Sequence, residues 1–177
     1  MSINNTTYTF DQIVDEVAPI KYNELQQSQA YSVSHFGVKN QGEKFLIKEL
    51  GLPFQSDFKG LYVFYEDDKP IYVGISKNVL KRLRQHVKCE KQNESSLAYL
   101  LTLEHAKQNN ISIPVETRAN RMKNKRFYKL FNSTVRKRLL KMKVKFIEID
   151  CDVTLYLSEV YFAMQLNTDK FNSFETH

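Results

Sequence analysis

Two short stretches near the middle of the chain, residues 60 to 65 and 70 to 75, alternate between apolar and polar positions and are rich in Tyr, Val, Ile and Phe. Side chains in such a pattern point alternately to two faces, which is typical of β-strands. The polar sequence EDDK joins the two stretches and fits a hairpin loop. The sequence VKFIEID, at 144 to 150, predicts a third strand.

Apolar residues at helical spacing predict helices on both sides of these strands. One helix is expected to begin near Ser76 or Asn78, since both residue types are good N-caps. Its apolar stripe comprises Val79, Leu80, Leu83 and Val87. Further helices are predicted at 95 to 108, within the basic segment that follows, and at 154 to 166. Helical spacing in residues 10 to 30 is interrupted at Pro19, which predicts two separate helical pieces.

The predicted hairpin places two tyrosines and two glycines on one face. Gly60 and Tyr62 are two residues apart, as are Tyr72 and Gly74, so each pair shares a face of its strand. A register in which Tyr62 faces Tyr72 and Gly60 faces Gly74 would set two phenols beside a patch without side chains. A phosphate could approach closely there. Ordinary hairpin packing is the alternative.

The helix after the hairpin carries an arginine and a histidine that belong together. Arg82 and His86 are four residues apart and lie on one helix face, whereas Arg84 lies on another. A guanidinium beside two phenols and an imidazole suits an oxyanion or a phosphate. The alternative is an ordinary exposed helix surface.

One acidic residue is isolated in the last predicted helix. Between Val153 and Thr168, Glu159 is the only charged residue. A buried unpaired carboxylate costs several kcal/mol and therefore needs a cation or a strong donor. Pairing with an arginine is one possibility. Ligation of Mg²⁺ is the other, because one carboxylate completed by water molecules suits that ion.

Positive charge is concentrated in one segment. Of the 26 basic residues, 12 lie between Arg118 and Lys145, a segment that contains no acidic residue. The rest of the chain holds the other 14 basic residues and all 20 acidic residues. Such a segment can neutralise several phosphates and release their counterions, which favours a polyanion partner. A solvated basic helix is the alternative.

Length and composition predict an ordered protein of one domain. The 177 residues are 42% hydrophobic and hold no long uncharged apolar run, so no membrane span is expected. The N-terminal sequence has no signal-peptide pattern, and an intracellular, cytoplasmic location follows. Two cysteines without CxxC spacing do not indicate a disulfide framework or a zinc site.

Together these residues resemble a known family, the GIY-YIG nucleases. GLY at 60 to 62 and YVG at 72 to 74 resemble its paired signature. Arg82 follows eight residues after Gly74, and His86 lies one helical turn later, as in that family. A third strand precedes the helix that bears Glu159, and Asn172 follows near the end.

The resemblance implies an α/β (α+β) fold in which a small three-stranded antiparallel sheet is flanked by helices. It places the nuclease domain at 51 to 177, after a helical N-terminal extension at 1 to 50. A long basic helical insertion, at about 89 to 143, departs from the family's short core. Leu61 replaces the usual isoleucine of the signature, a volume-conserving change.

The resemblance also implies metal-dependent hydrolysis of phosphodiester bonds. By similarity, Glu159 holds one divalent ion, Mg²⁺ or Mn²⁺, and Tyr62 acts as general base on water. Tyr72 positions or assists, and Arg82 stabilises charge on the phosphate. His86 supports the nucleophile, and Asn172 orders the site.

The expected substrate is double-stranded DNA, held by the insertion. Its candidate phosphate contacts are Arg118, Arg121, Lys123, Lys125, Arg126, Arg136, Lys137 and Arg138. The chain has no room for a separate DNA-reading domain, which favours a site-specific type II restriction enzyme acting as a homodimer or higher homo-oligomer. The alternatives are a repair or phage nuclease of loose or structure-specific cleavage, a non-catalytic nucleic-acid-binding module, and a protein-interaction domain.

Overall fold

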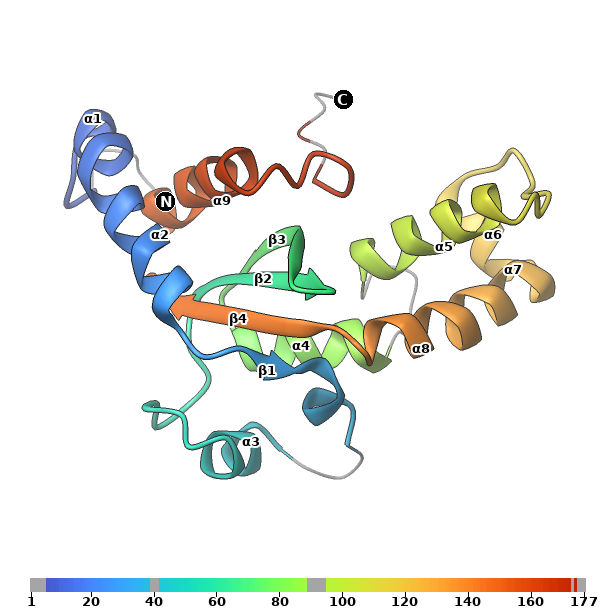
Figure 1. The fold of residues 1–177 in the computed structure, drawn as a ribbon, viewed down its shortest axis with the longest axis horizontal. Helices are drawn as coiled ribbons and strands as arrows, with labels where there is room; N and C mark the ends of the chain where they lie inside the picture. The colour runs from blue at the N-terminus through green and yellow to red at the C-terminus, as the bar shows by residue number, and fades with distance from the viewer. Residues whose placement is uncertain (1–5, 39–41, 89–94, 173, 175–177) are drawn as a thin grey trace.

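A four-stranded antiparallel sheet forms the centre of the protein, seen in a computed structural model that describes residues 6–38, 42–88, 95–172 and 174 (Figure 1). Only the backbone is described at 134–135. The strand order is β1-β4-β2-β3. The strands are β1 (Tyr31–Ser32), β2 (Gly60–Glu66), β3 (Lys69–Ser76) and β4 (Lys143–Glu148). The predicted fold class is confirmed, and the fourth strand, β1, is a two-residue addition from the N-terminal extension.

The hairpin β2–β3 turns where its polar loop was predicted, but its register differs from the predicted one. Asp67 and Asp68 have positive φ angles of 49° and 61°, as a tight two-residue hairpin turn requires. Tyr62 faces Gly74 and Phe64 faces Tyr72. The predicted pairing of Tyr62 with Tyr72 is therefore wrong.

A bulge next to the turn explains the register. Glu66 pairs with Lys69, and a ladder continued without interruption would set Tyr62 opposite Val73 and the two tyrosines on opposite faces. The register shifts between Phe64 and Tyr65, which leaves Ile71 of β3 unpaired. This extra residue shifts the pairing of the rest of β3 by one position. Tyr62 and Tyr72 therefore lie on the same face of the sheet.

The described part of the chain contains nine α-helical segments. Their bounds are α1 (Phe10–Gln12), α2 (Ala18–Gln27), α3 (Glu43–Glu49), α4 (Val79–Lys88), α5 (Ser96–Gln108), α6 (Arg118–Lys123), α7 (Lys125–Leu130), α8 (Arg136–Leu139) and α9 (Asp152–Gln165). Two π-helical segments, Ile13–Val17 and Phe131–Val135, continue neighbouring helices, and Val33–Gly37 forms a 3-10 helix. Within the described residues, no helix is long and apolar enough to cross a membrane.

Local sequence accounts for two departures from the predicted helices. The helical piece expected to stop at Pro19 continues through it. The π-helical segment Ile13–Val17 lies just before this proline, whose backbone nitrogen cannot donate a helical hydrogen bond. Helix α4 begins where predicted, but the carboxylate of Asp57 caps it. The backbone N–H groups of Leu80 and Lys81 donate to Asp57 at 2.8 and 2.9 Å.

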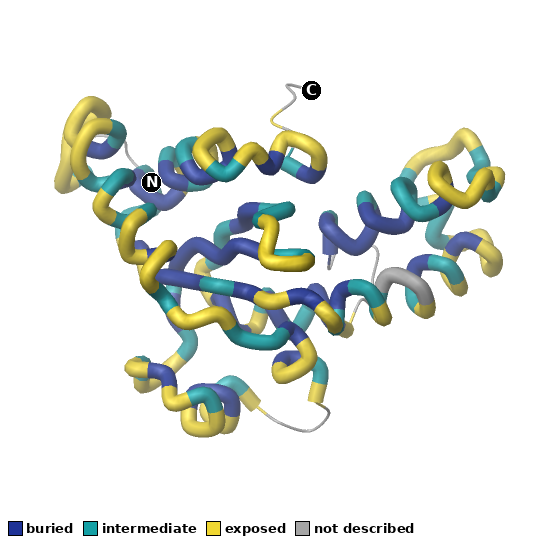
Figure 2. The backbone as a smooth tube through the Cα atoms, viewed as in Figure 1, coloured by how far each residue is buried: buried dark blue, intermediate teal, exposed yellow. Residues whose placement is uncertain are grey.

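The two faces of the sheet bury different sets of side chains. Leu61 and Val63 of β2 face helices α2 and α9, whereas Tyr62 and Phe64 face the larger core between the sheet and α4 (Figure 1). Residues of β2 are therefore buried on both faces, as Figure 2 shows by the dark blue of this strand. The extension packs onto this core, since α2 contacts α9 and β1 pairs with β4.

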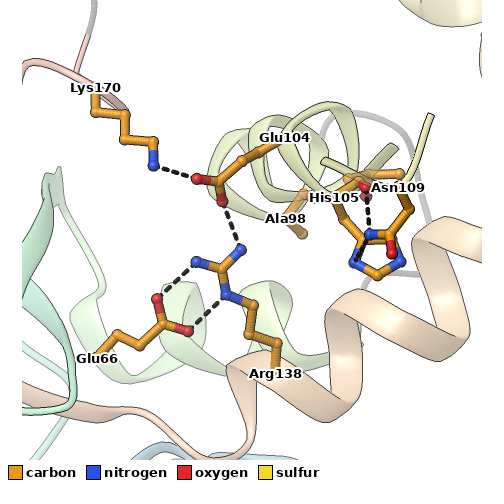
Figure 3. Close-up of polar contacts among 8 residues, drawn as sticks. Glu66, Ala98, Glu104, His105, Asn109, Arg138 and Lys170 are labelled. Atoms are coloured by element: carbon orange, nitrogen blue, oxygen red, sulfur yellow. Dashed lines mark hydrogen bonds and ion pairs between the residues drawn. The ribbon is translucent and has the colours of Figure 1, made fainter. Parts of the chain in front are cut away.

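The insertion forms a helical arm that extends from one end of the sheet (Figure 1). Its helices α5 to α8 bury Phe127 and Phe131, so these aromatic residues belong to the core of the arm. An ion-pair network, which we call the Arg138 network, joins the arm to the rest of the protein (Figure 3). It comprises Arg138 of α8, Glu66 of β2, Glu104 of α5 and Lys170 of the C-terminal segment.

Candidate active site

Tyr62 lies in the centre of the candidate site and depends on a neighbouring glycine. Its side chain is 1% exposed, and its ring lies across the backbone of Gly74 on the adjacent strand. A Cβ atom at position 74 would lie 2.5 Å from the Tyr62 hydroxyl oxygen, a distance at which atoms clash. Glycine at this position is therefore required for the ring to lie there.

The open patch predicted beside the tyrosines does not exist. The ring of Tyr62 fills the space at Gly74. At Gly60, an added Cβ would collide with the backbone carbonyl of Ile147 on β4. Both glycines permit close packing within the protein, and neither leaves a gap for a phosphate.

Tyr72 and His86 surround Tyr62 on the same side of the sheet. The ring centroids of Tyr62 and Tyr72 are 6.5 Å apart, and those of Tyr72 and His86 are 6.1 Å apart. Burial raises the pKa of both phenols, so both tyrosines are neutral in the absence of a further cation. These distances bring the two phenols and the imidazole together, and their catalytic roles stay predictions.

His86 connects Tyr62 to the insertion through buried hydrogen bonds. Its Nε2 lies 2.9 Å from the Tyr62 hydroxyl, and its Nδ1 lies 2.8 Å from Oγ of Ser95. His86 and Ser95 are both 0% exposed. Burial, with a smaller contribution from Arg82, holds the pKa of His86 well below its ordinary value, so the imidazole is neutral. Sequence reasoning missed Ser95, although its place as N-cap of a predicted helix could have marked it.

Arg82 supplies positive charge to this cluster. It lies one helical turn before His86 on α4, and its charge lowers the pKa of both Tyr62 and Tyr72 against the opposite effect of burial. Nη1 of Arg82 also lies 3.5 Å from Oε1 of Gln85. A guanidinium in this position can stabilise the ionised form of either phenol or an added phosphate.

Glu159 lies on α9, a helix that packs against strands β3 and β2. Its carboxylate raises the pKa of both tyrosines, which places it within their electrostatic reach. Burial raises the pKa of Glu159 itself to about 7. The two alternatives for this carboxylate, an arginine partner and a metal ion, both stay predictions.

Asn172 fixes the edge of the sheet beside the tyrosines. Its Oδ1 accepts a hydrogen bond from the backbone N–H of Val73 at 2.8 Å, and its Nδ2 donates to the carbonyl of the same residue at 2.8 Å. Val73 lies between Tyr72 and Gly74 on β3, which has no strand on its outer side within the described sheet. Asn172 thus satisfies backbone groups that an edge strand leaves open.

The basic residues predicted to contact phosphates fall into two groups. Arg118 reaches the site, because its Nη2 donates to the carbonyl of Ser95 at 3.1 Å and its guanidinium lies 4.6 Å from the ring centroid of Tyr99. Arg121 bonds the hydroxyl of Tyr99 at 2.8 Å, and Arg138 belongs to the ion-pair network. The second group lies on the surface of the arm and comprises Lys123, Lys125, Arg126 and Lys137, which are exposed, and Arg136, which is half-buried.

Comparison with known families identifies the arrangement. The family model described as the GIY-YIG catalytic domain matches residues 58–151, just over half of the chain. The protein belongs to the GIY-YIG family. It is an endonuclease, and the resemblance read from the two tripeptides is confirmed at the level of the superfamily. No curated protein and no solved structure gives a significant match.

The family match ends before α9, so it contains Tyr62, Tyr72, Arg82 and His86 but neither Glu159 nor Asn172. The roles of Glu159 and Asn172 in this GIY-YIG nuclease must therefore be argued from their positions in the structure.

GIY-YIG nucleases generally depend on a divalent metal ion, and Glu159 fits that requirement. Its carboxylate is partly buried and burial raises its pKa, so a cation bound beside it would favour the ionised form. The described residues contain no group of three or more His, Cys, Asp and Glu side chains that could enclose a metal. A single carboxylate completed by water and phosphate oxygens is the arrangement that Mg²⁺ commonly takes beside a phosphate substrate.

Proposed function

We propose that this GIY-YIG nuclease is a site-specific type II restriction endonuclease that cuts double-stranded DNA with Mg²⁺ or Mn²⁺. One observation carries the proposal. The basic arm is joined to the site itself, since Ser95 of the arm contacts His86, and Arg118 of the arm contacts Ser95. Recognition elements built onto the catalytic core suit an enzyme that finds and cuts its target within one domain.

The proposed chemistry assigns a task to each residue around Tyr62. Tyr62 removes a proton from the attacking water, and Arg82 offsets the negative charge that develops on the phosphate. Tyr72 orients the phosphate, His86 supports Tyr62, and Asn172 holds the strand on which Tyr72 lies. A divalent ion held by Glu159 would act as a Lewis acid on the phosphate and favour ionisation of a nearby phenol.

The basic arm is the proposed binding surface for DNA. Its exposed residues Lys123, Lys125, Arg126 and Lys137 can contact phosphates without losing an internal partner, since none of them forms an ion pair among the described residues. Arg118 and Arg121 lie nearer the site and Arg138 is held by two carboxylates, so we assign the outer phosphate contacts to the exposed group. Because the chain carries one such site, cutting both strands calls for a homodimer or a higher homo-oligomer.

Cleavage of a long, mixed-sequence DNA duplex tests the proposal. Wild type, Glu159→Gln and the matched control Glu148→Gln are incubated with Mg²⁺ or Mn²⁺; Glu148 is an exposed acid at the end of β4. We expect discrete fragments from wild type and the control, and no cleavage by Glu159→Gln. Glu159→Gln should still bind the duplex, because the basic arm is unchanged.

Other outcomes of this assay point to the alternative functions. A smear of products, or cutting only at branched DNA, would replace the restriction enzyme with a nuclease of loose or structure-specific cleavage. Binding without cleavage by wild type, with either metal and on DNA, RNA and branched substrates, would indicate a nucleic-acid-binding module.

A further inference from the structure

Arg118 belongs to the basic arm, but its contacts lie beside the candidate site. It is the first residue of α6, and its Nη2 donates a hydrogen bond to the backbone carbonyl of Ser95 at 3.1 Å. The side chain of Ser95 lies 2.8 Å from Nδ1 of His86, whose ring centroid is 6.1 Å from that of Tyr72. One residue, Ser95, therefore connects the guanidinium of Arg118 to the imidazole beside the tyrosines.

Tyr99 of α5 holds this guanidinium in place. The guanidinium carbon of Arg118 lies 4.6 Å from the centroid of the Tyr99 ring, within the range of a cation–π interaction. Arg121, one turn later on α6, donates to the hydroxyl of the same tyrosine at 2.8 Å and to the carbonyl of Pro114 at 2.9 Å. These contacts fix α6 against α5, so the position of Arg118 is set by the packing of the arm.

The charge of Arg118 acts on the same phenol as the charge of Arg82. Both guanidiniums lower the pKa of Tyr72, against the larger and opposite effect of burial. Burial lowers the pKa of Arg118 itself, and the positive charge of Arg82 lowers it further. Two guanidiniums, one from α4 and one from the arm, are therefore within electrostatic reach of each other and of Tyr72.

Two positive charges in this arrangement favour an anion that contacts both. Like charges repel, and the half-buried position of Arg118 reduces the screening of that repulsion by water. A guanidinium has several N–H donors, so Arg118 can hold the Ser95 carbonyl and a phosphate oxygen at the same time. Arginine also matches the geometry of a phosphate group, whose oxygens accept parallel hydrogen bonds.

We propose that Arg118 is a second catalytic arginine, which binds a non-bridging oxygen of the scissile phosphate together with Arg82. The inference rests on the proposed function, in which Tyr72 orients this phosphate. Arg118 donates hydrogen bonds and transfers no proton. Negative charge on the phosphate grows as the nucleophile attacks, so a second guanidinium stabilises the transition state more than bound DNA. The arm then supplies part of the catalytic site as well as the outer phosphate contacts.

Binding of inorganic phosphate to the metal-free protein tests the anion site without cleavage. The proteins compared are wild type, Arg118→Gln, Arg82→Gln and the matched control Arg84→Gln. Arg84 lies on another face of α4, where its Nη1 is 3.3 Å from Oε1 of Glu43. Thermal unfolding in chloride first checks that each variant folds.

Phosphate should then raise the melting temperature of wild type and Arg84→Gln above the value in chloride at equal ionic strength. We expect this rise to fall to about half or less in Arg118→Gln and in Arg82→Gln, since each removes one of two cationic ligands. The exposed basic residues of the arm are unchanged in all four proteins, so their contribution is common to all. An equal rise in Arg118→Gln and Arg84→Gln would overturn the proposal.

Single-turnover cleavage separates a catalytic role from simple DNA binding. Arg118→Gln should lower the rate of cleavage of bound DNA about 100-fold, with little change in affinity for the duplex. Arg118→Lys keeps the charge and should recover about 10-fold of that loss, although a lysine cannot reproduce the fork of the guanidinium. Weaker binding at an unchanged rate would make Arg118 an outer phosphate contact and overturn the proposal, as would equal rates for the two Arg118 variants.

The two measurements distinguish failure of this inference from failure of the proposed function. A protein that loses its response to phosphate in Arg118→Gln but never cuts duplex DNA would refute the proposed function and leave Arg118 as a phosphate ligand. Site-specific cleavage that proceeds at the wild-type rate in Arg118→Gln would support the proposed function and refute the role of Arg118.

Discussion

At the scale of single residues, Gly74 explains why the second tripeptide of the signature ends in glycine here. The Tyr62 ring occupies the space that any larger side chain at position 74 would need. The strand register brings the two residues opposite one another, and the buried bond from Tyr62 to His86 holds the ring in place. The glycine therefore serves the orientation of the Tyr62 side chain and not the flexibility of the strand.

Gly74→Ala should displace the Tyr62 ring and break its bond to His86. We expect a loss of stability of about 1–3 kcal/mol from overpacking, and a fall in cleavage rate of at least about 100-fold. Urea unfolding and single-turnover cleavage measure the two effects. Gly42→Ala is the control, because nothing lies within 4 Å of a Cβ added there. Equal behaviour of the two variants would show that Gly74 is not needed to seat the ring.

Glu159 predicts an unusual dependence of stability on pH. Its pKa rises from an ordinary value of 4.5 to about 7 in the folded protein, so folding favours the protonated form. The stabilisation is complete below pH 4.5 and is lost as pH rises through 7. With allowance for partial exposure, metal-free protein should lose about 1–2 kcal/mol over this range.

Urea titrations at several pH values check this dependence, with Glu159→Gln as the comparison. The variant cannot ionise, so its stability should lack the decline between pH 4.5 and 7. Above pH 7, Mg²⁺ should stabilise wild type more than Glu159→Gln, because only the ionised carboxylate binds the ion well. Parallel pH curves for the two proteins, with no selective effect of Mg²⁺, would argue against Glu159 as the metal ligand.

At the scale of secondary-structure elements, the sequence was informative about strands and helices and misleading about their pairing. Alternation located β2 and β3, and apolar spacing located α4, α5 and α9, because these patterns follow from burying one side of an element. The predicted register of the hairpin was wrong because it did not include the bulge at Ile71. With this bulge, the tight Asp67–Asp68 turn and two tyrosines on one face occur in the same hairpin. A single-residue insertion of this kind has no local sequence signature.

Contacts between distant elements were the other feature that the sequence did not reveal. Asp57 caps α4 from the loop before β2. Ser95, the N-cap of α5, forms a hydrogen bond with His86 of α4. Each is a polar residue of a common type, and only the fold shows which backbone or side chain it meets. The residues of the candidate site that could be predicted were those with fixed spacing in the family signature.

At the scale of the whole molecule, the arm is fastened to the sheet by polar contacts at two places. The Arg138 network joins β2, α5, α8 and the C-terminal segment, and the contacts of Ser95 join α5 to α4. Arg138 donates two hydrogen bonds of 2.6 Å to Glu66 and one of 2.6 Å to Glu104. These carboxylates raise the pKa of Arg138, which keeps it charged and engaged.

Neighbouring basic residues of the arm should therefore respond differently to the same substitution. In the sequence, Lys137 and Arg138 are equal candidates for phosphate contacts, whereas in the fold Lys137 is exposed and Arg138 is held by two carboxylates. Arg138→Gln should cost about 1–3 kcal/mol of stability, because it leaves Glu66 and Glu104 without their shared partner. Lys137→Gln should leave stability unchanged within about 0.5 kcal/mol.

DNA binding should show the reverse order of effects. Lys137→Gln should weaken binding at low salt and reduce the slope of log K against log[salt] by about 0.9, the contribution of one phosphate contact. Arg138→Gln should leave that slope unchanged, since its charge is already offset within the protein. Fluorescence anisotropy with labelled duplex, over a range of salt concentrations, measures both slopes. If Arg138→Gln reduces the slope and Lys137→Gln does not, then the DNA lies along the Arg138 network, and binding must open the ion pairs that hold the arm to the sheet.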